Sequence, residues 1–235
     1  MKTGKYLLAL IFISVFINSA EAELRPQGGI ASYFGANNYF SVNPWGGIRV
    51  NVTSNSSLLL NYRFYSLQFD YTNKMGESYL RKAELNNFTT ALYTRNWGHD
   101  FYAAASIFSG TDDYSAFSLD LGTELHPADR LAITAGIYYL NEDLVLWYPE
   151  EGSGKIDVYS VKGGFRYSLL DGLSLGPTLE FYRNSQEVTA YSVGAMVQFI
   201  PVEPVYVNFS YYYYSESAQY KFSGNFFSAG LNLYY

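Results

Sequence analysis

Hydrophobic and polar residues alternate along most of the chain with a period of two residues. In the clearest stretch, residues 117–125, apolar residues or threonine occupy every second position, and Ser, Asp, Gly and Glu lie between them. Because successive side chains of a β-strand point to opposite faces, this pattern predicts a strand with one apolar and one polar face. The same interpretation predicts eleven further strands, at residues 28–39, 48–52, 58–65, 88–93, 103–108, 131–139, 159–167, 173–181, 191–199, 205–213 and 228–235.

Two kinds of connection join the predicted strands. Tight turns are expected at residues 53–57, 96–100, 126–130, 169–172 and 201–204. The other connections, several of them longer and rich in Asp, Glu, Asn and Ser, are 36–44, 66–78, 109–113, 141–155, 183–187 and 215–221. Short turns at one end and longer loops at the other are typical of a transmembrane β-barrel. Residues 81–85 are the only short piece with any helical character, and no helix is predicted there.

The first residues have the features of a secretory signal peptide. Lys2 and Lys5 precede an apolar run from Tyr6 to Ile17, and Ala20-Glu21-Ala22 follows as a small-residue cleavage site. A retained membrane anchor is the alternative, but the run is shorter than the roughly 20 apolar residues that a spanning helix needs. We therefore predict cleavage after Ala22, which leaves residues 23–235 as a single barrel domain.

Composition narrows the possible environments of this domain. The 235 residues are 49% hydrophobic and 15% charged, with 25 tyrosines, no cysteine and a net charge of -6. Soluble domains carry about 25% charged residues, so this surface is short of charge. The composition argues against a disordered chain, a nucleic-acid-binding protein, a disulfide scaffold and a cysteine-ligated metal site. A soluble secreted barrel or sandwich also alternates, but its water-facing side would usually carry Lys and Glu rather than Tyr, Gly and Ser.

The end of the chain carries a further signal. Aromatic or apolar residues occupy every second position of the last strand and include the final residue: Phe227, Ala229, Leu231, Leu233 and Tyr235. With the signal peptide and the alternating strands, this run resembles bacterial outer-membrane β-barrel proteins. The resemblance implies an all-β, antiparallel, up-and-down transmembrane barrel of about twelve strands in the bacterial outer membrane. It also implies contact with outer-membrane lipid and lipopolysaccharide, and recognition of the last strand by the barrel-assembly machinery; a protein partner is unknown.

If the apolar faces meet lipid, the polar faces line the interior of the barrel. The charged residues expected there are Arg49, Arg63, Asp120, Glu124, Lys162, Arg166 and Glu180. One interpretation is a network of internal ion pairs that stiffens and closes the barrel, because charges in a confined interior must be paired or hydrated. The other is a narrow polar constriction that orients a permeating solute. The predicted function is a narrow passive channel for small polar solutes; the alternative is a non-conducting structural or partner-binding barrel.

The size and strand number are also similar to those of small porins for acidic oligosaccharides. Those channels carry tracks of basic residues, whereas the inward Arg and Lys residues here are mixed with Asp and Glu. The resemblance therefore does not extend to an anionic sugar as the substrate. No nucleic-acid partner is expected.

Catalysis is not expected. Some outer-membrane barrels are hydrolases that use histidine near the outer rim, but His99 and His126 both fall in predicted tight turns. No G-x-S-x-G or H-E-x-x-H motif is present, and no metal site or cofactor is predicted. The acidic connection 141–155 fits a solvated loop; its central apolar residues, 144–148, fit instead a segment that folds inward or contacts a partner.

Overall fold

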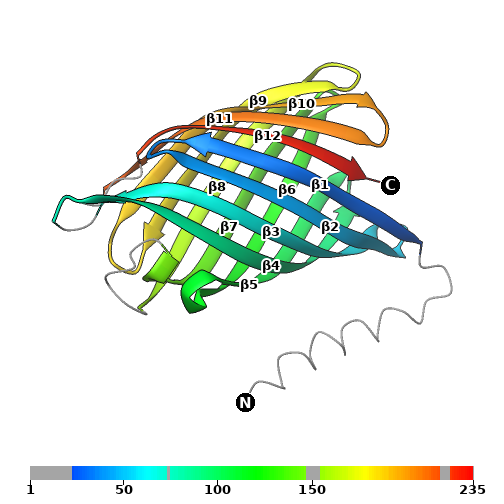
Figure 1. The fold of residues 1–235 in the computed structure, drawn as a ribbon. Coiled ribbons are helices and arrows are strands. Elements are labelled where there is room, and N and C mark those ends of the chain that lie inside the picture. Colours follow the sequence, from blue (N-terminus) through cyan, green and yellow to red (C-terminus); the bar gives the residue numbers. More distant parts are fainter. Residues whose placement is uncertain (1–22, 73–74, 147–153, 218–222, 235) are drawn as a thin grey trace.

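The computed structural model describes residues 23–72, 75–146, 154–217 and 223–234. Twelve strands form one closed sheet in which each strand pairs antiparallel with its neighbours in sequence, and the last strand pairs with the first (Figure 1). The predicted fold, an up-and-down barrel of about twelve strands, is confirmed. The strands are β1 (Leu24–Gly35), β2 (Tyr39–Thr53), β3 (Ser56–Thr72), β4 (Ser78–Asn96), β5 (His99–Gly110), β6 (Ser115–Ala128), β7 (Leu131–Asp143), β8 (Lys155–Leu170), β9 (Leu173–Asn184), β10 (Thr189–Val202), β11 (Val205–Glu216) and β12 (Gly224–Tyr234).

The barrel has two different ends. At the end called here the turn end, β1 starts, β12 finishes, and short turns join β2 to β3, β4 to β5, β6 to β7, β8 to β9 and β10 to β11. The opposite, loop end carries the other connections, including two short 3-10 helices, η1 (Thr111–Asp113) and η2 (Leu144–Leu146). The predicted signal peptide lies outside the described residues. Within them, no helix has the length and hydrophobicity to cross a membrane.

The expected connection at 36–44 was wrong. β1 already ends at Gly35 and β2 begins at Tyr39, so only three residues connect the two strands. Asn37 and Asn38 adopt the left-handed conformation, with φ angles of 55° and 52°. Two consecutive residues with positive φ match the twist of antiparallel strands, and asparagine tolerates this conformation better than most residues. A tight turn therefore replaces the expected loop.

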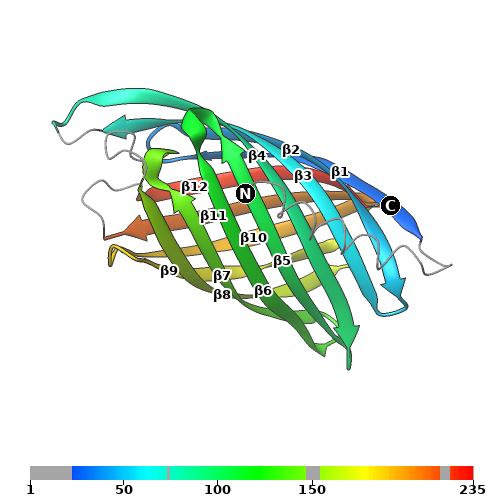
Figure 2. The ribbon, with the colours of Figure 1, turned by 90° about the horizontal axis from the view of Figure 1, so that it is seen from below.

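The expected connection at 66–78 was also wrong. β3 continues to Thr72, β4 starts at Ser78, and residues 81–85 belong to β4. The resulting hairpin extends furthest from the barrel at its loop end in both views (Figures 1 and 2). Several of its inward-facing residues are apolar and buried, with Leu67 5% and Phe69 0% exposed. Burial of these side chains stabilises a strand where the polar residues between them suggested a loop.

A hydrophobic core therefore lies inside the barrel at its loop end. Leu67 and Phe69 are an even number of residues from Arg63, so they share its inner face, which the sequence predicted to be mainly polar. The core contains the buried residues Leu67, Phe69, Tyr71, Ala83, Leu85, Tyr114, Ala116 and Leu146. The inner face is apolar here because η2 brings its own apolar side chains inside the barrel, where they pack against it.

Helix η2 is the start of the acidic connection after β7, and it folds inward. Leu144 is 4% and Leu146 1% exposed. Arg81 of β4 fixes the segment: its Nε donates to the carbonyl of Leu146 at 3.1 Å, and its Nη2 donates to the carbonyl of Val145 at 2.9 Å. The same Nη2 pairs with Asp112 of η1 at 2.8 Å. Of the two interpretations of this connection, residues 144–146 follow the inward one, and residues 147–153 lie outside the described part.

Candidate functional site: the polar interior of the barrel

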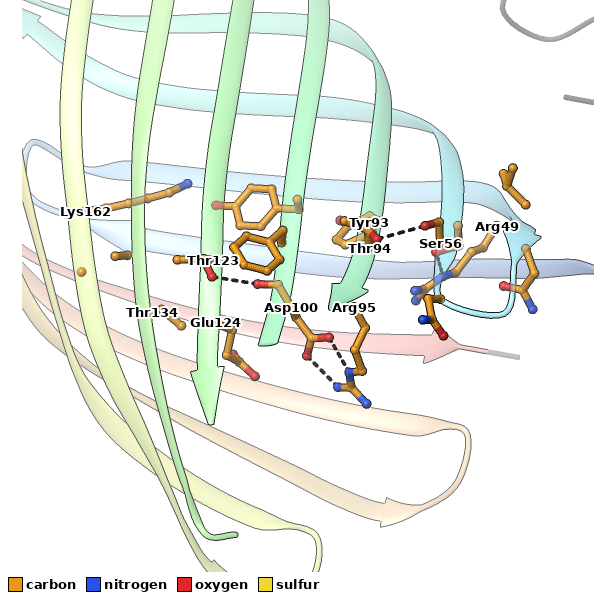
Figure 3. A pocket seen from close by; sticks show the side chains of 18 of the residues that line it. Arg49, Ser56, Tyr93, Thr94, Arg95, Asp100, Thr123, Glu124, Thr134 and Lys162 are labelled. Carbon is orange, nitrogen blue, oxygen red and sulfur yellow. Dashed lines mark hydrogen bonds and ion pairs between the residues drawn. The ribbon is translucent and has the colours of Figure 1, made fainter. Parts of the chain in front are cut away.

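A cavity of about 1490 Å³ occupies the turn-end half of the barrel. Its wall includes the β2–β3 turn, residues 51–57, and reaches Lys162 of β8, Glu180 of β9 and Ser192 of β10. Figure 3 shows Lys162 and Arg49 extending toward the cavity from opposite sides of the view. Alternation explains this lining, because every second residue of each strand points inward.

One wall carries a ladder of ion pairs that joins β8 to β6. Lys162 Nζ lies 2.7 Å from both carboxylate oxygens of Asp120, and Arg166 Nη2 lies 2.6 Å from Glu124 Oε1. The Lys162 ammonium also lies 5.5 Å from the centre of the Tyr102 ring, whose hydroxyl donates to Asp120 at 3.1 Å. Four of the seven charged residues selected from the sequence are thus brought together in two pairs.

Both pairs cross the intervening strand β7, and the sequence of β7 makes this possible. Gly136 lies beneath the Lys162 side chain: a Cβ atom there would come within 2.9 Å of Lys162 Cε and 2.8 Å of the Leu121 carbonyl oxygen. A larger residue at this position would displace the lysine side chain. The glycine therefore contributes to the site although it carries no functional group.

A second group of charges lies at the rim of the turn end. Arg95 binds both carboxylate oxygens of Asp100, at 2.6 and 2.7 Å (Figure 3). His126 Nε2 lies 3.1 Å from Asp100 Oδ2 and 3.5 Å from Glu124 Oε1.

The side chains of Asp100, Glu124 and His126 have ligand atoms within 4.8 Å of one another, so their geometry could hold a metal ion. Guanidinium groups already bind both carboxylates, however: Arg95 binds Asp100 and Arg166 binds Glu124. The arrangement therefore favours an ion-pair cluster. His99 Nδ1, at the start of β5, accepts a hydrogen bond from the backbone N–H of His126 in β6 at 3.4 Å, so both predicted turn histidines lie in strands.

The opposite wall, formed by β2 and β3, carries two arginines in a different environment. Arg49 Nε donates to Ser57 at 2.8 Å, and its guanidinium lies 5.2 Å from the centre of the Tyr93 ring. The Arg63 guanidinium lies 5.9 Å from Trp45 and 6.0 Å from Tyr65. Buried Arg63 Nε has no hydrogen-bond partner, and within the described residues neither arginine forms an ion pair. The partners of these two cations are therefore the faces of aromatic rings rather than carboxylates.

Glu180, on β9, is the seventh charged residue selected from the sequence. It accepts hydrogen bonds from Ser160 at 2.6 Å and from Tyr182 at 2.7 Å. Lys162 is its direct neighbour across the β8–β9 pair, yet the lysine ammonium binds Asp120 instead. Among the described residues no basic side chain forms an ion pair with Glu180. Its carboxylate is stabilised by hydroxyl groups alone.

Aromatic side chains fill part of the interior nearer the loop end. The Phe226 ring of β12 stacks on Tyr212 with a centroid distance of 5.3 Å and an interplanar angle of 9°, and it forms a T-shaped contact with the Tyr39 ring. Gly35 makes room for this ring, because a Cβ atom there would lie 2.0 Å from Phe226 Cδ1. Together with the hydrophobic core on β3–β6, these rings narrow the interior away from the cavity.

Sequence reasoning missed several residues of the interior. Arg81, Tyr93, Arg95, Asp100 and Tyr102 were not selected, because three lie in or beside segments expected to be turns or loops and two are tyrosines without a distinctive spacing. In the last strand, Phe227 and Leu231 lie on the outer face, 52% and 45% exposed. Their proposed recognition by the assembly machinery stays a prediction, and Tyr235 lies outside the described residues.

Comparisons with known proteins agree with the geometry. No family model matches the chain, and no curated protein matches it in sequence. Among solved structures, an outer-membrane channel from Pseudomonas putida F1 superposes with a TM-score of 0.69 at 10% identity, over 90% of this chain and 95% of that one. The KdgM porin gives 0.60 at 11% identity and the NanC porin 0.60 at 8%; each comparison covers 88% of this chain and 98% of the porin.

This chain has the fold of the outer-membrane porins. The expected resemblance to outer-membrane barrels is confirmed at the level of fold. At such low identity the likeness extends to architecture and not to substrate. The class of solute that this barrel transports must therefore be inferred from the residues that line its interior.

Proposed function

We propose that this protein is a bacterial outer-membrane barrel that acts as a narrow passive channel for small polar solutes. The observation that carries the proposal is the charged cavity that extends from the turn end as far as Lys162 and Glu180. In outer-membrane barrels short turns face the periplasm, so the cavity would open there. Barrels of eight strands are filled by side chains and those of sixteen leave a water channel, and twelve strands fit a narrow path between these cases.

The direct test is the conductance of folded protein in planar lipid bilayers. Discrete current steps that depend on the inserted protein are expected, because the charged wall of the cavity must be hydrated. Protein unfolded before addition to the bilayer serves as the control. Absence of steps from protein whose β-sheet circular dichroism spectrum is intact would contradict the channel function.

Reversal of one interior charge should change ion selectivity. Arg63→Glu removes a cation that has no ion-pair partner among the described residues and introduces an anion, so the ratio of cation to anion permeability should rise. The measurement is the reversal potential in a KCl gradient. Lys82→Glu, on the outer face of the β3–β4 hairpin, is the matched control with the same change in net charge. Equal reversal potentials for Arg63→Glu and wild type would show that ions do not pass this residue.

The hydrophobic core at the loop end favours the second candidate function, a non-conducting structural or partner-binding barrel. Phe69, Leu146 and their neighbours occupy interior space that a wide pore would leave open. The bilayer measurement separates the two functions, because a closed barrel gives no steps.

A further inference from the structure

In the described part of the chain, most of the charged residues that line the cavity are ion-paired, but two of them are not. Its lining contains seven charged residues: Glu23, Arg49, Arg95, Asp100, Glu124, Lys162 and Glu180. Five of them have a partner of opposite charge, in the pairs Glu23–Arg25, Arg95–Asp100, Glu124–Arg166 and Lys162–Asp120. Among the described residues, Arg49 and Glu180 are the two lining charges that lack such a partner.

These two residues lie nearly across the barrel from each other. In the closed sheet β2 and β9 are five strands apart in one direction and seven in the other. Arg49 uses its Nε for Ser57, and no described residue accepts a hydrogen bond from its terminal nitrogens. Glu180 is held by the hydroxyls of Ser160 and Tyr182, which fix the carboxylate without neutralising it. One cavity therefore presents an available cation on one wall and an available anion on the other.

Such a cavity discriminates among solutes by their charge. An anion is attracted to Arg49 but repelled by Glu180. A cation is attracted to Glu180 but repelled by Arg49. A solute with both charges gains at both walls if the charges are far enough apart. In a single amino acid the ammonium and the carboxylate are attached to the same α-carbon, whereas an extended peptide spans about 3.3–3.6 Å per residue.

We infer that this cavity favours short peptides with free termini, with the carboxylate directed to Arg49 and the ammonium to Glu180. The inference rests on the proposed channel function and adds its class of solute. The paired charges elsewhere in the lining support it, because they present little net charge to a passing solute. Partly hydrated ion contacts are individually weak, so the selection acts on the rate of passage rather than through tight binding.

The test is liposome swelling with four solutes of nearly the same size: triglycine, N-acetyl-triglycine, triglycine amide and N-acetyl-triglycine amide. These carry both charges, the anion alone, the cation alone and no charge. With the wild-type protein, triglycine should enter about 2- to 5-fold faster than either singly charged solute, as expected for contacts of this strength. Equal or slower entry of triglycine would overturn the inference.

Two substitutions assign the effect to the residues. Glu180→Gln should slow triglycine and triglycine amide but not N-acetyl-triglycine, and Arg49→Gln should slow triglycine and N-acetyl-triglycine but not the amide. The double exchange Arg49→Glu with Glu180→Arg should restore the advantage of triglycine, because the peptide can pass in the reverse orientation. Glu84→Gln, exposed on the outer face of β4, is the control.

The possible failures are distinguishable. If a substitution changes the rates of all four solutes equally, its effect is steric and the inference is wrong. If even the uncharged peptide fails to enter liposomes that contain folded protein, the channel function itself is wrong.

Discussion

Replacing Leu146 with aspartate is expected to raise the single-channel conductance several-fold. Leu146 is 1% exposed and packs inside the barrel against the apolar residues of β3 and β4. The neighbouring Arg81 guanidinium is already bound to Asp112 and to two carbonyl groups, so a carboxylate in these apolar surroundings costs several kcal/mol, more than the packing of one leucine contributes. The η2 segment should therefore leave the core, and the space that it occupied becomes available to ions. The measurement is the current step in planar bilayers at fixed salt and voltage.

Two further variants sharpen this prediction. Trp97→Asp places the same charge on an exposed turn, where Trp97 is 93% exposed, and should leave the current step unchanged. Arg81→Met removes the hydrogen bonds to the carbonyls of Val145 and Leu146 without burying a charge. It should also raise the conductance, by less than Leu146→Asp does. Wild-type conductance in both core variants would mean that η2 does not obstruct the path.

Replacing Phe69 with alanine is expected to lower the free energy of unfolding by about 3–5 kcal/mol, the usual cost of removing a buried aromatic ring. Phe69 is fully buried inside the loop end, so the variant leaves a void within the cluster that also contains Leu67, Leu85 and Leu146. The measurement is urea unfolding in lipid vesicles, followed by circular dichroism. Phe88→Ala is the matched control, because Phe88 is 55% exposed on the outer face, where lipid tails can fill the vacated space. Equal losses in the two variants would contradict an internal core.

Together these substitutions separate packing from obstruction. Phe69 belongs to the wall and Leu146 to the segment that folds in, although both are in one hydrophobic cluster. A large loss of stability with unchanged conductance in Phe69→Ala, and a large gain of conductance in Leu146→Asp, would show that the segment rather than the wall controls the path.

The sequence by itself determined the strands and their two faces over most of the chain. Alternation is a local property, since each side chain points opposite to its neighbour whatever the strand pairs with. The strand number and the inward position of Arg49 and Glu180 follow from it, whereas the antiparallel order was implied by the resemblance to outer-membrane barrels. It failed at residues 66–72, where the polar residues between Leu67, Phe69 and Tyr71 resembled a loop, because the partner that buries these side chains is a segment remote in sequence.

Only the tertiary structure decided which interior charges are paired. Lys162 is directly opposite Glu180 in the β8–β9 register, and a pairing rule based on neighbouring strands would join them. The ammonium instead crosses Gly136 to bind Asp120, two strands away, and Glu180 keeps only hydroxyl partners. The choice depends on the curvature of the closed wall, on the length of the lysine side chain and on the space above a glycine. The pattern along the chain encodes which face a residue occupies, but only closure of the barrel sets the distances across that face, and these distances decide the electrostatics.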